Sequence, residues 1–509
     1  MRLFVLVLSL LLVLCGCDDI RDNTAKQSFF IEGGLPEIGE FSKGQVKNYY
    51  QDTVRYEISP VEGVDVLIPF IGSSRKFFPT ELSSFGFGTT YHSYGFCLSS
   101  GDIVFEANDD ITSCKYISDG DYGVYELTIQ LDSKQIDDFG SSKTVILSED
   151  GMWMIELGRN GTVYMMKDGY IFTRSFVNGI SEPALCLVYD YKGNLVFTFD
   201  DGLFFMSFSN SMFLVRNTDD EMYYFLNTDG SIKLGPYLRT YPFNSEGYTF
   251  ALSESGNYSI IDTDGNIKSS GDWYDVDSVV GESESAFVCY CGKELNKADI
   301  YSAAGEYISS IQSEREIIEN VLLFFTEDND IIYTYDNWAS NWKRLSTGER
   351  FVSRDLGVCP NSIDDYDGYF FYRNDISKSG ALFDENGETV VKSSNMDFVL
   401  GVCGRNGIVI YRADDSLYVY DINRKKNILT KDTADAYAAF SENERYLVVT
   451  FDGKSHLFDI ESKEYVFENA LFISAFVIDG KTYFNVVTNT SSTLYDEDKN
   501  VMVRVLIDR

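Results

Sequence analysis

Short apolar runs alternate with polar turns along most of the chain, and this alternation repeats. Its clearest copies are CLVYDYKGN, YSIIDTDGN and GALFDENGE, in which an Asp stands three residues before a Gly. Looser copies occur around Gly230, Gly305 and Gly348, and the pattern continues without its Gly in LYVYDINRKK, SHLFDIESKE and STLYDEDKNV. The equivalent positions lie 35 to 43 residues apart, at 193, 230, 265, 305, 348, 387, 424, 462 and 499. Such a period predicts a repeat architecture.

One repeat has room for four strands. In the clearest unit, Tyr446–Phe451 is the first apolar run, the second ends at Phe458, Glu464–Phe467 is the third, and a fourth fits Ala470–Ile478. Four short strands with their turns need about 38 residues. The sequence therefore predicts an all-β fold: a β-propeller of four-stranded antiparallel blades, with about 11–12 repeats of roughly 38 residues. In each turn we expect the Asp to accept backbone hydrogen bonds and the Gly to adopt a left-handed conformation.

Other architectures fit the pattern less well. Helical repeats need apolar spacings of three and four residues, whereas these runs are short and rich in Tyr, Phe, Val and Ile. A stack of β-sandwiches is the main alternative. The segment SEREIIENVLLFF could begin a helix, with Ser313 and Glu316 forming a capping box. The repeat phase instead favours a strand from Val321 to Phe325.

The number of rings is less clear from the pattern. Before Gly193 the phase is irregular: Gly101 and Gln135 fit it, and Val64–Phe78 could hold one more unit. We favour two tandem propellers divided near residue 275, with residues 28–275 in the first and residues 276–509 in the second. The alternative is one 7–8-bladed propeller preceded by an N-terminal β domain. The final strand could close a ring with an early one.

Two segments resemble known repeat families. The segment Phe440–Asp459 resembles a WD-repeat blade without its Trp-Asp signature, and Tyr94–Ile111 is similar to the WG-type repeats of bacterial surface proteins. Both families form propellers or propeller-like arrays, and both act chiefly as interaction platforms. The resemblance therefore implies a binding role.

The N-terminus has the features of a lipoprotein signal. Arg2 is followed by the apolar run Leu3–Leu14, which is too short to span a bilayer and suits a signal peptide of residues 1–16. The pair Gly16-Cys17 resembles a bacterial lipobox, which implies lipid attachment at Cys17, a tether of residues 17–27 and a place on the extracytoplasmic face of a cell membrane. Several acyl chains would anchor the protein firmly. A single signal-anchor helix is the alternative, and the choice between inner and outer membrane stays open.

The composition is strongly acidic. The 79 Asp and Glu against 42 Lys and Arg give a formal net charge of -37. This charge argues against nucleic acid and anionic membrane surfaces as partners. It could recruit basic partners, or it could simply keep the protein soluble.

Cysteine and histidine offer little for catalysis or metal binding. Of nine Cys, seven remain outside the signal segment, an odd number that does not suggest a disulfide framework. Cys289 and Cys291 fall on one face of a strand, and we predict buried thiols there. The chain has only two His: we expect His92 in a loop and His456 half-exposed on a blade. We therefore assign no metal and no cofactor.

The conspicuous carboxylates share one repeat phase, which turns explain, so we assign no catalytic residue to them: Asp190, Asp262, Asp384, Asp421, Asp459 and Asp496. A glycosidase needs only two carboxylates at the right separation, so this class of enzyme stays open. Trp338 and Trp342, in DNWASNWKR, lie in the longest interval of the series. They are the candidate binding residues, because exposed aromatics can stack on sugars or anchor a partner. Burial against a blade edge is the alternative.

The leading hypothesis is a non-catalytic, membrane-anchored extracytoplasmic lipoprotein that serves as a binding platform. Its partner would be an unknown extracytoplasmic protein or glycan, and its lipid would hold it to the membrane. One alternative is a carboxylate-dependent glycoside hydrolase or lyase on a propeller scaffold. Another is an envelope-assembly scaffold lipoprotein in a cell with two membranes.

Overall fold

The described strands of the chain form eleven antiparallel β-sheets in the computed structural model. All regular elements in the described ranges are strands. The structure describes residues 54–57, 66–77, 89–108, 110–130, 142–158, 161–175, 185–199, 202–280, 285–291, 296–313, 318, 321–326, 330–335, 342–356, 358–360, 362–363, 369–374, 379–393, 396–403, 407–441 and 444–507.

The chain divides into two compact units, and the first joins both ends of the sequence. It comprises Met1–Val196 and Ala470–Arg509. Its sheets have the strand orders β2-β3-β4, β1-β8-β7-β6-β5, β12-β11-β10-β9 and β40-β41-β42-β43. Their strands are β1 (Val54–Glu57), β2 (Ile68–Phe77), β3 (Thr89–Cys97), β4 (Ile103–Asn108), β5 (Ile111–Ser118), β6 (Gly123–Gln130), β7 (Ser142–Ser148), β8 (Trp153–Gly158), β9 (Thr162–Lys167), β10 (Tyr170–Ser175), β11 (Leu185–Asp190), β12 (Leu195–Thr198), β40 (Phe472–Ile478), β41 (Lys481–Val487), β42 (Ser491–Tyr495) and β43 (Val501–Leu506).

The second unit, Phe197–Asn469, has seven sheets among its described residues. Each sheet uses strands that are consecutive in the sequence. The strands are β13 (Leu203–Ser209), β14 (Met212–Asn217), β15 (Tyr223–Asn227), β16 (Ile232–Tyr237); β17 (Arg239–Thr240), β18 (Tyr248–Leu252), β19 (Tyr258–Asp262), β20 (Ile267–Ser270); β21 (Trp273–Val280), β22 (Ser285–Cys291), β23 (Lys297–Ser302), β24 (Tyr307–Gln312); β25 (Leu322–Phe325), β26 (Ile331–Thr334), β27 (Lys343–Arg344); β28 (Ser362–Ile363), β29 (Tyr369–Asn374), β30 (Ser379–Asp384), β31 (Thr389–Ser393); β32 (Met396–Cys403), β33 (Ile408–Ala413), β34 (Ser416–Asp421), β35 (Lys426–Lys431); β36 (Tyr437–Phe440), β37 (Tyr446–Phe451), β38 (Lys454–Asp459) and β39 (Glu464–Ala470).

The blades of a β-propeller are small antiparallel sheets of this kind, repeated along the chain. The predicted all-β propeller is therefore confirmed, with eleven blades among the described residues, as is the strand predicted at Val321–Phe325 in place of a helix. Two tandem propellers divided near residue 275 are wrong, because that position lies inside β21 and the C-terminal sheet joins the N-terminal sheets in one unit. The alternative of one 7–8-bladed propeller preceded by an N-terminal β domain does not match the structure either, since the N-terminal strands form blades too. The repeat period specifies blades but not how they are grouped.

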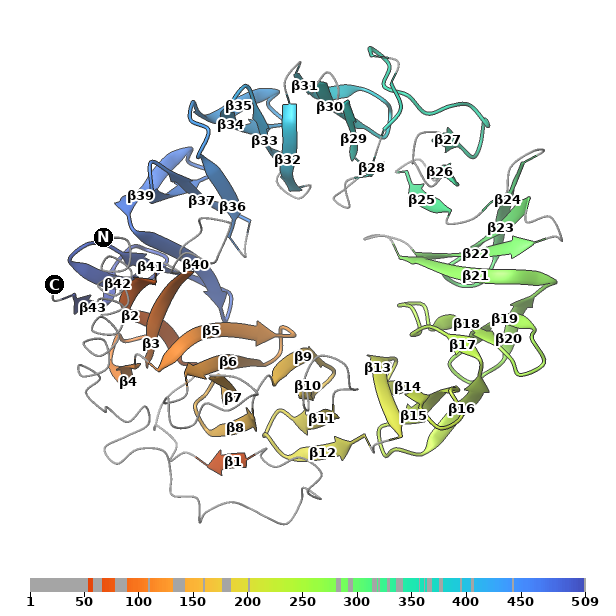
Figure 1. Cartoon of the computed structure of the whole chain (residues 1–509), viewed down its shortest axis with the longest axis horizontal. Helices are drawn as coiled ribbons and strands as arrows, with labels where there is room; N and C mark the ends of the chain where they lie inside the picture. Colours follow the sequence, from red (N-terminus) through yellow and green to blue (C-terminus); the bar gives the residue numbers. More distant parts are fainter. Residues whose placement is uncertain are drawn as a thin grey trace, which may run out of the picture. The chain divides into compact units, whose positions relative to one another are not determined.

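In the first unit, the first and last parts of the described chain pack together. Strand β2 contacts β41, β42 and β43, and Figure 1 shows β2 and β3 beside β40 to β43. The Asn485 side chain accepts a hydrogen bond from the Ile71 amide at 3.3 Å and donates one to the Pro69 carbonyl at 3.4 Å. Strand β43 pairs with β42 and contacts β2 without pairing with it. Side chains such as that of Asn485 therefore join β2 to the C-terminal sheet.

The recurring turn joins the third and fourth strands of a blade. The Asp190 side chain accepts hydrogen bonds from the amides of Lys192 and Asn194, at 2.9 and 2.7 Å, and Gly193 has a φ of 71°. This confirms the predicted roles of Asp and Gly. A Cβ on Gly193 would also lie 2.7 Å from the Trp153 ring, so its absence allows the turn to pack on the neighbouring sheet.

The strand grouping predicted for one repeat is shifted by one strand. The sheet begins at β36, before the run predicted as first, and Phe472–Ile478 is the first strand of the next sheet. A repeat in the sequence gives the period but does not mark where each unit starts.

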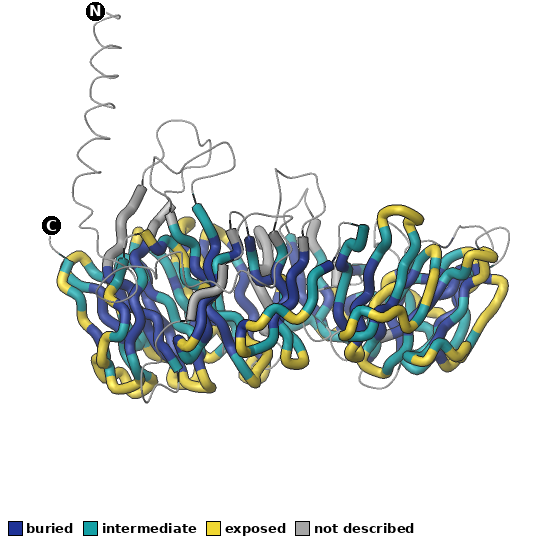
Figure 2. The backbone as a smooth tube through the Cα atoms, turned by 90° about the horizontal axis from the view of Figure 1, so that it is seen from below, coloured by how far each residue is buried: buried dark blue, intermediate teal, exposed yellow. Residues whose placement is uncertain are grey.

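Burial follows the position of a strand in its sheet. The second strand β14 is fully buried over Met212–Val215, whereas the outermost strand β16 is largely exposed. Figure 2 shows buried segments along the strands and exposed turns at their ends. Blades therefore use continuous apolar runs in their middle strands, because neighbouring sheets cover both faces.

Candidate functional site

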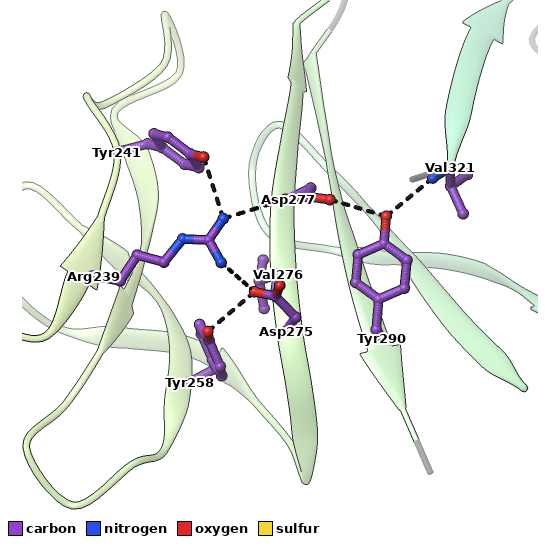
Figure 3. A network of polar contacts seen from close by, with 8 residues as sticks. All are labelled: Arg239, Tyr241, Tyr258, Asp275, Val276, Asp277, Tyr290 and Val321. Atoms are coloured by element: carbon purple, nitrogen blue, oxygen red, sulfur yellow. Dashed lines mark hydrogen bonds and ion pairs between the residues drawn. The ribbon is translucent and has the colours of Figure 1, made fainter. Parts of the chain in front are cut away.

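One group of polar side chains links two consecutive sheets of the second unit. It comprises Arg239, Tyr241, Tyr258, Asp275, Asp277 and Tyr290, and is called the Arg239 cluster below (Figure 3). Arg239 starts β17, Tyr258 starts β19, and the two Asp lie on β21. It is the candidate functional site because it brings a cation, two carboxylates and three phenols together.

A β-bulge at the start of β21 positions Asp275. The pairing of β21 with β22 shifts register between Trp273 and Asp275. Trp273 and Val276, three residues apart, both belong to the same buried core. An extra residue is therefore accommodated between them, which is how a bulge redirects a side chain. Asp277 then follows Asp275 on the same face of the strand.

The guanidinium of Arg239 connects the two sheets. Its Nη1 lies 2.5 Å from Asp275 Oδ1, while its Nη2 donates to Tyr241 Oη at 3.2 Å and lies 3.5 Å from Asp277 Oδ1. The guanidinium carbon also lies 5.5 Å from the centre of the Tyr241 ring and 5.6 Å from that of Phe250. Such stacking adds a cation–π attraction to the ion pairs.

Two tyrosine hydroxyls also bind the carboxylates, Tyr258 from the sheet of Arg239 and Tyr290 from strand β22 beside β21. Tyr258 donates to Asp275 Oδ1 at 3.1 Å, and the same oxygen accepts from the Val276 amide at 2.8 Å. Tyr290 donates to Asp277 Oδ2 at 3.0 Å and accepts from the Val321 amide at 3.0 Å. The network thus extends from β17 to the residue before β25.

The cluster is charged, yet water reaches it. The side chains of Arg239 and Asp275 are each 33% exposed. Burial works to lower the pKa of Arg239, but the Tyr241 hydrogen bond and the Asp275 charge outweigh it and raise that pKa. Burial and the nearby Asp275 charge raise the pKa of Tyr258, and burial raises that of Tyr290. The hydroxyls of Tyr258 and Tyr290 therefore stay protonated and act as hydrogen-bond donors at neutral pH.

Exposed aromatic surface lies beside these groups. Tyr241 is 40% exposed, and its ring stands edge-on to the buried Phe250 at 5.0 Å between ring centres. The cluster therefore offers hydrogen-bond donors, acceptors and an oriented aromatic ring on one accessible part of the unit.

The predicted site residues lie elsewhere. Trp342 is completely buried in a cluster with Ile332, Phe351, Phe370 and Phe383, so a ligand could reach it only if this core opened. Its role in binding stays a prediction. Trp338 and the lipid-attachment residue Cys17 lie outside the described residues.

The two His differ from expectation. His92 lies in strand β3 and not in a loop, and it is 8% exposed. His456, in β38, is 3% exposed rather than half-exposed. Burial lowers the pKa of both imidazoles, that of His92 to about 4. Period-two patterns cannot distinguish a polar residue that fills a gap between sheets from one that faces water.

The turn carboxylates follow the prediction, and of the two thiols predicted to be buried only Cys289 is fully so. Cys289 is buried and Cys291 partly buried on β22, and burial raises the pKa of both thiols, that of Cys291 to about 11. Asp262 and Asp384 each accept backbone hydrogen bonds within their turns.

Neither a metal-binding group nor a helix able to cross a membrane is found among the described residues. No group of three or more His, Cys, Asp or Glu is placed to hold a metal ion. Within the same ranges, no helix has the length and hydropathy needed to cross a membrane.

The Arg239 cluster was missed because it lies outside the repeat phase. A signal was available in the sequence: WYDVD places two carboxylates on one face of a strand directly after two aromatic residues. Nothing in the sequence shows that Arg239, 36 residues earlier than Asp275, reaches them.

Comparisons with known proteins add little. No known protein family matches the chain, and no curated protein does. Among solved structures, a eukaryotic initiation factor is similar at 12% identity, with a TM-score of 0.37 over 82% of this chain and 97% of that chain. Hsv2 from Kluyveromyces marxianus and Hsv2 from Kluyveromyces lactis each share 12% identity and a TM-score of 0.26, over 54% and 53% of this chain and 97% of theirs. At these identities and TM-scores the similarity carries no inference, and the fold is assigned from the sheets of this chain alone.

Proposed function

We propose that the protein is a non-catalytic, membrane-anchored extracytoplasmic lipoprotein whose propeller blades form a binding platform for a protein or a glycan. The observation that supports this most is the Arg239 cluster, where paired charges lie beside the exposed ring of Tyr241. Paired charges with accessible aromatic surface suit recognition, because they offer directional hydrogen bonds and apolar contact together.

The anchor is proposed from the sequence. Gly16-Cys17 resembles a lipobox, and lipid on Cys17 would hold the blades close to a membrane surface. Replacing Cys17 by Ala should abolish acyl labelling and release the protein from the membrane fraction. A variant that keeps both its label and its membrane partition would overturn this part of the proposal.

A glycoside hydrolase or lyase is the second candidate, and the same cluster favours it. Two carboxylates, an Arg and three Tyr converge there, and a pair of carboxylates is the minimum for glycoside cleavage. In the structure, both carboxylates are engaged by Arg239 and by a Tyr hydroxyl, an arrangement that favours binding over proton transfer to a substrate.

Turnover distinguishes the two candidates. The purified full-length protein, incubated with a broad glycan panel, should release no reducing sugar and no unsaturated product. Robust turnover that Asp275→Asn abolishes would overturn the non-catalytic function and establish the enzyme.

A further inference from the structure

We propose that the Arg239 cluster binds neutral glycans, with the Tyr241 ring stacking on a sugar and the Arg239–Asp275 pair contacting adjacent hydroxyls. This rests on the proposed platform function and names its ligand class and its site. The donors, acceptors and aromatic surface that support it lie together in the second unit (Figure 3).

The hydrogen-bonding groups match a polyol. A sugar hydroxyl both donates and accepts, so two adjacent hydroxyls are best met by a donor and an acceptor side by side. Arg239 supplies N–H donors and Asp275 supplies carboxylate oxygens, with 2.5 Å between the paired atoms. The Asp275 Oδ1 atom is shared by Arg239, Tyr258 and the Val276 amide, whereas the contacts known within the described ranges leave its Oδ2 without a protein partner.

The aromatic surface is held in place before a ligand arrives. The Tyr241 hydroxyl accepts a hydrogen bond from Arg239, its ring abuts Phe250, and its carbonyl accepts from Thr249 at 2.8 Å. A ring fixed in this way loses little conformational entropy on binding. With 40% of the residue exposed, Tyr241 can still offer apolar surface to the C–H groups of a sugar.

Charge decides between the ligand classes. Within the cluster, one Arg and two Asp give a formal charge of -1, and the whole chain carries -37. An anionic glycan would therefore be repelled. A cationic group would have to compete with Arg239 for carboxylates that the guanidinium already pairs. A neutral glycan meets neither obstacle.

The experiment is a binding panel on the full-length protein in detergent solution. The probes are neutral hexasaccharides (cellohexaose, maltohexaose, N-acetylchitohexaose), an anionic oligogalacturonate and the cationic chitosan hexamer, measured by glycan array and then by titration calorimetry. At least one neutral probe should bind, and the anionic probe should bind at least tenfold more weakly.

Variants assign the binding to this site. Tyr241→Ala should weaken the neutral probe at least tenfold, whereas Tyr241→Phe, which keeps the ring, should weaken it no more than about threefold. Arg239→Lys loses the planar fork and should also weaken it at least tenfold. Tyr307→Ala is the matched control, because Tyr307 lies on the outermost strand β24 of the same unit and is 58% exposed. It should bind like the unaltered protein.

Each of the other outcomes overturns one part of the proposal: the site, the ligand class or the non-catalytic function. If no neutral probe binds, or if Tyr241→Ala binds as well as the unaltered protein with an unchanged circular dichroism spectrum, the glycan site is wrong. Binding confined to the cationic chitosan hexamer, and lost with Asp275→Asn, would overturn the neutral ligand class and leave the platform. Cleavage of a bound neutral probe would overturn the non-catalytic function and leave the glycan class.

Discussion

Two junctions between neighbouring sheets use polar side chains in opposite ways. In the first unit, where β2 meets β41, the neutral Asn485 is 3% exposed and completes the hydrogen bonds of buried backbone. In the second unit, where β17 meets β21, Arg239 and Asp275 are charged and 33% exposed. Burying a charge costs more than burying an amide, so charges are kept where water reaches them. A neutral buried link serves stability, whereas a charged accessible link is available for binding.

The largest expected effect comes from Asn485→Ala. The substitution removes both hydrogen bonds and leaves the Ile71 amide and the Pro69 carbonyl unsatisfied at a buried junction. Each buried unsatisfied group costs about 1–3 kcal/mol, so the free energy of unfolding should fall by about 2–4 kcal/mol. Chemical denaturation measures it.

The matched control for that prediction is Asn500→Ala in the same unit. The Asn500 amide donates to Asp496 at 3.0 Å in an exposed turn, so its loss should cost below about 1 kcal/mol. Equal losses in the two variants would contradict the special role of Asn485.

His92 should make the same junction sensitive to acid. Its ring centre lies 4.3 Å from that of Phe472 on β40, and burial lowers the imidazole pKa to about 4. With an unfolded pKa near 6.5, the unfolded chain binds a proton that the folded protein does not, so stability falls as the pH falls from about 6.5 to about 4. After allowing for solvent screening, the loss should be about 2 kcal/mol.

The measurement is the pH dependence of the free energy of unfolding for the unaltered protein and for His92→Phe. The Phe variant should lose less stability between these pH values by about the same 2 kcal/mol. Parallel curves for the two proteins would show that His92 does not titrate in this way.

Gly101 tests how closely the N-terminal and C-terminal sheets of the first unit pack, because it lies against Met502 on β43. Its φ is 89°, and a Cβ there would lie 2.7 Å from the Met502 carbonyl oxygen on β43. Gly120 has a φ of 98° with nothing within 4 Å of such a Cβ. Both Ala variants suffer backbone strain, but Gly101→Ala should lose about 1–2 kcal/mol more through overpacking. Equal thermal shifts for the two would show that the junction adapts to an added methyl group.

Arg239→Met should have the smallest effect on stability. The Met side chain keeps apolar cover over Tyr241 and Phe250 while removing the ion pairs. Because these pairs are partly exposed, the loss should be below about 1 kcal/mol and should shrink as salt is added. Denaturation at low and high salt measures it, and a loss as large as that of Asn485→Ala would abolish the distinction between the two junctions.

The sequence predicted the repeating parts well because their causes are local. Asp190 and Gly193 form their turn within four residues, so the period could be read directly from the chain. The Arg239 cluster was beyond such reasoning, since Arg239 meets Asp275 across two sheets and a bulge. His92 was placed wrongly for a similar reason, because its burial comes from Phe472, which is far away in the sequence.

The sequence by itself determined the strand content, the turn chemistry and the blade as the repeating unit, because short-range hydrogen bonds and alternating apolar positions suffice for these. Tertiary structure decided which blades belong together, where each blade begins and which polar groups meet. Those features depend on side chains such as Asn485 and Arg239, which find partners in other sheets. A periodic pattern describes one unit, whereas contacts between units depend on the residues that depart from the pattern.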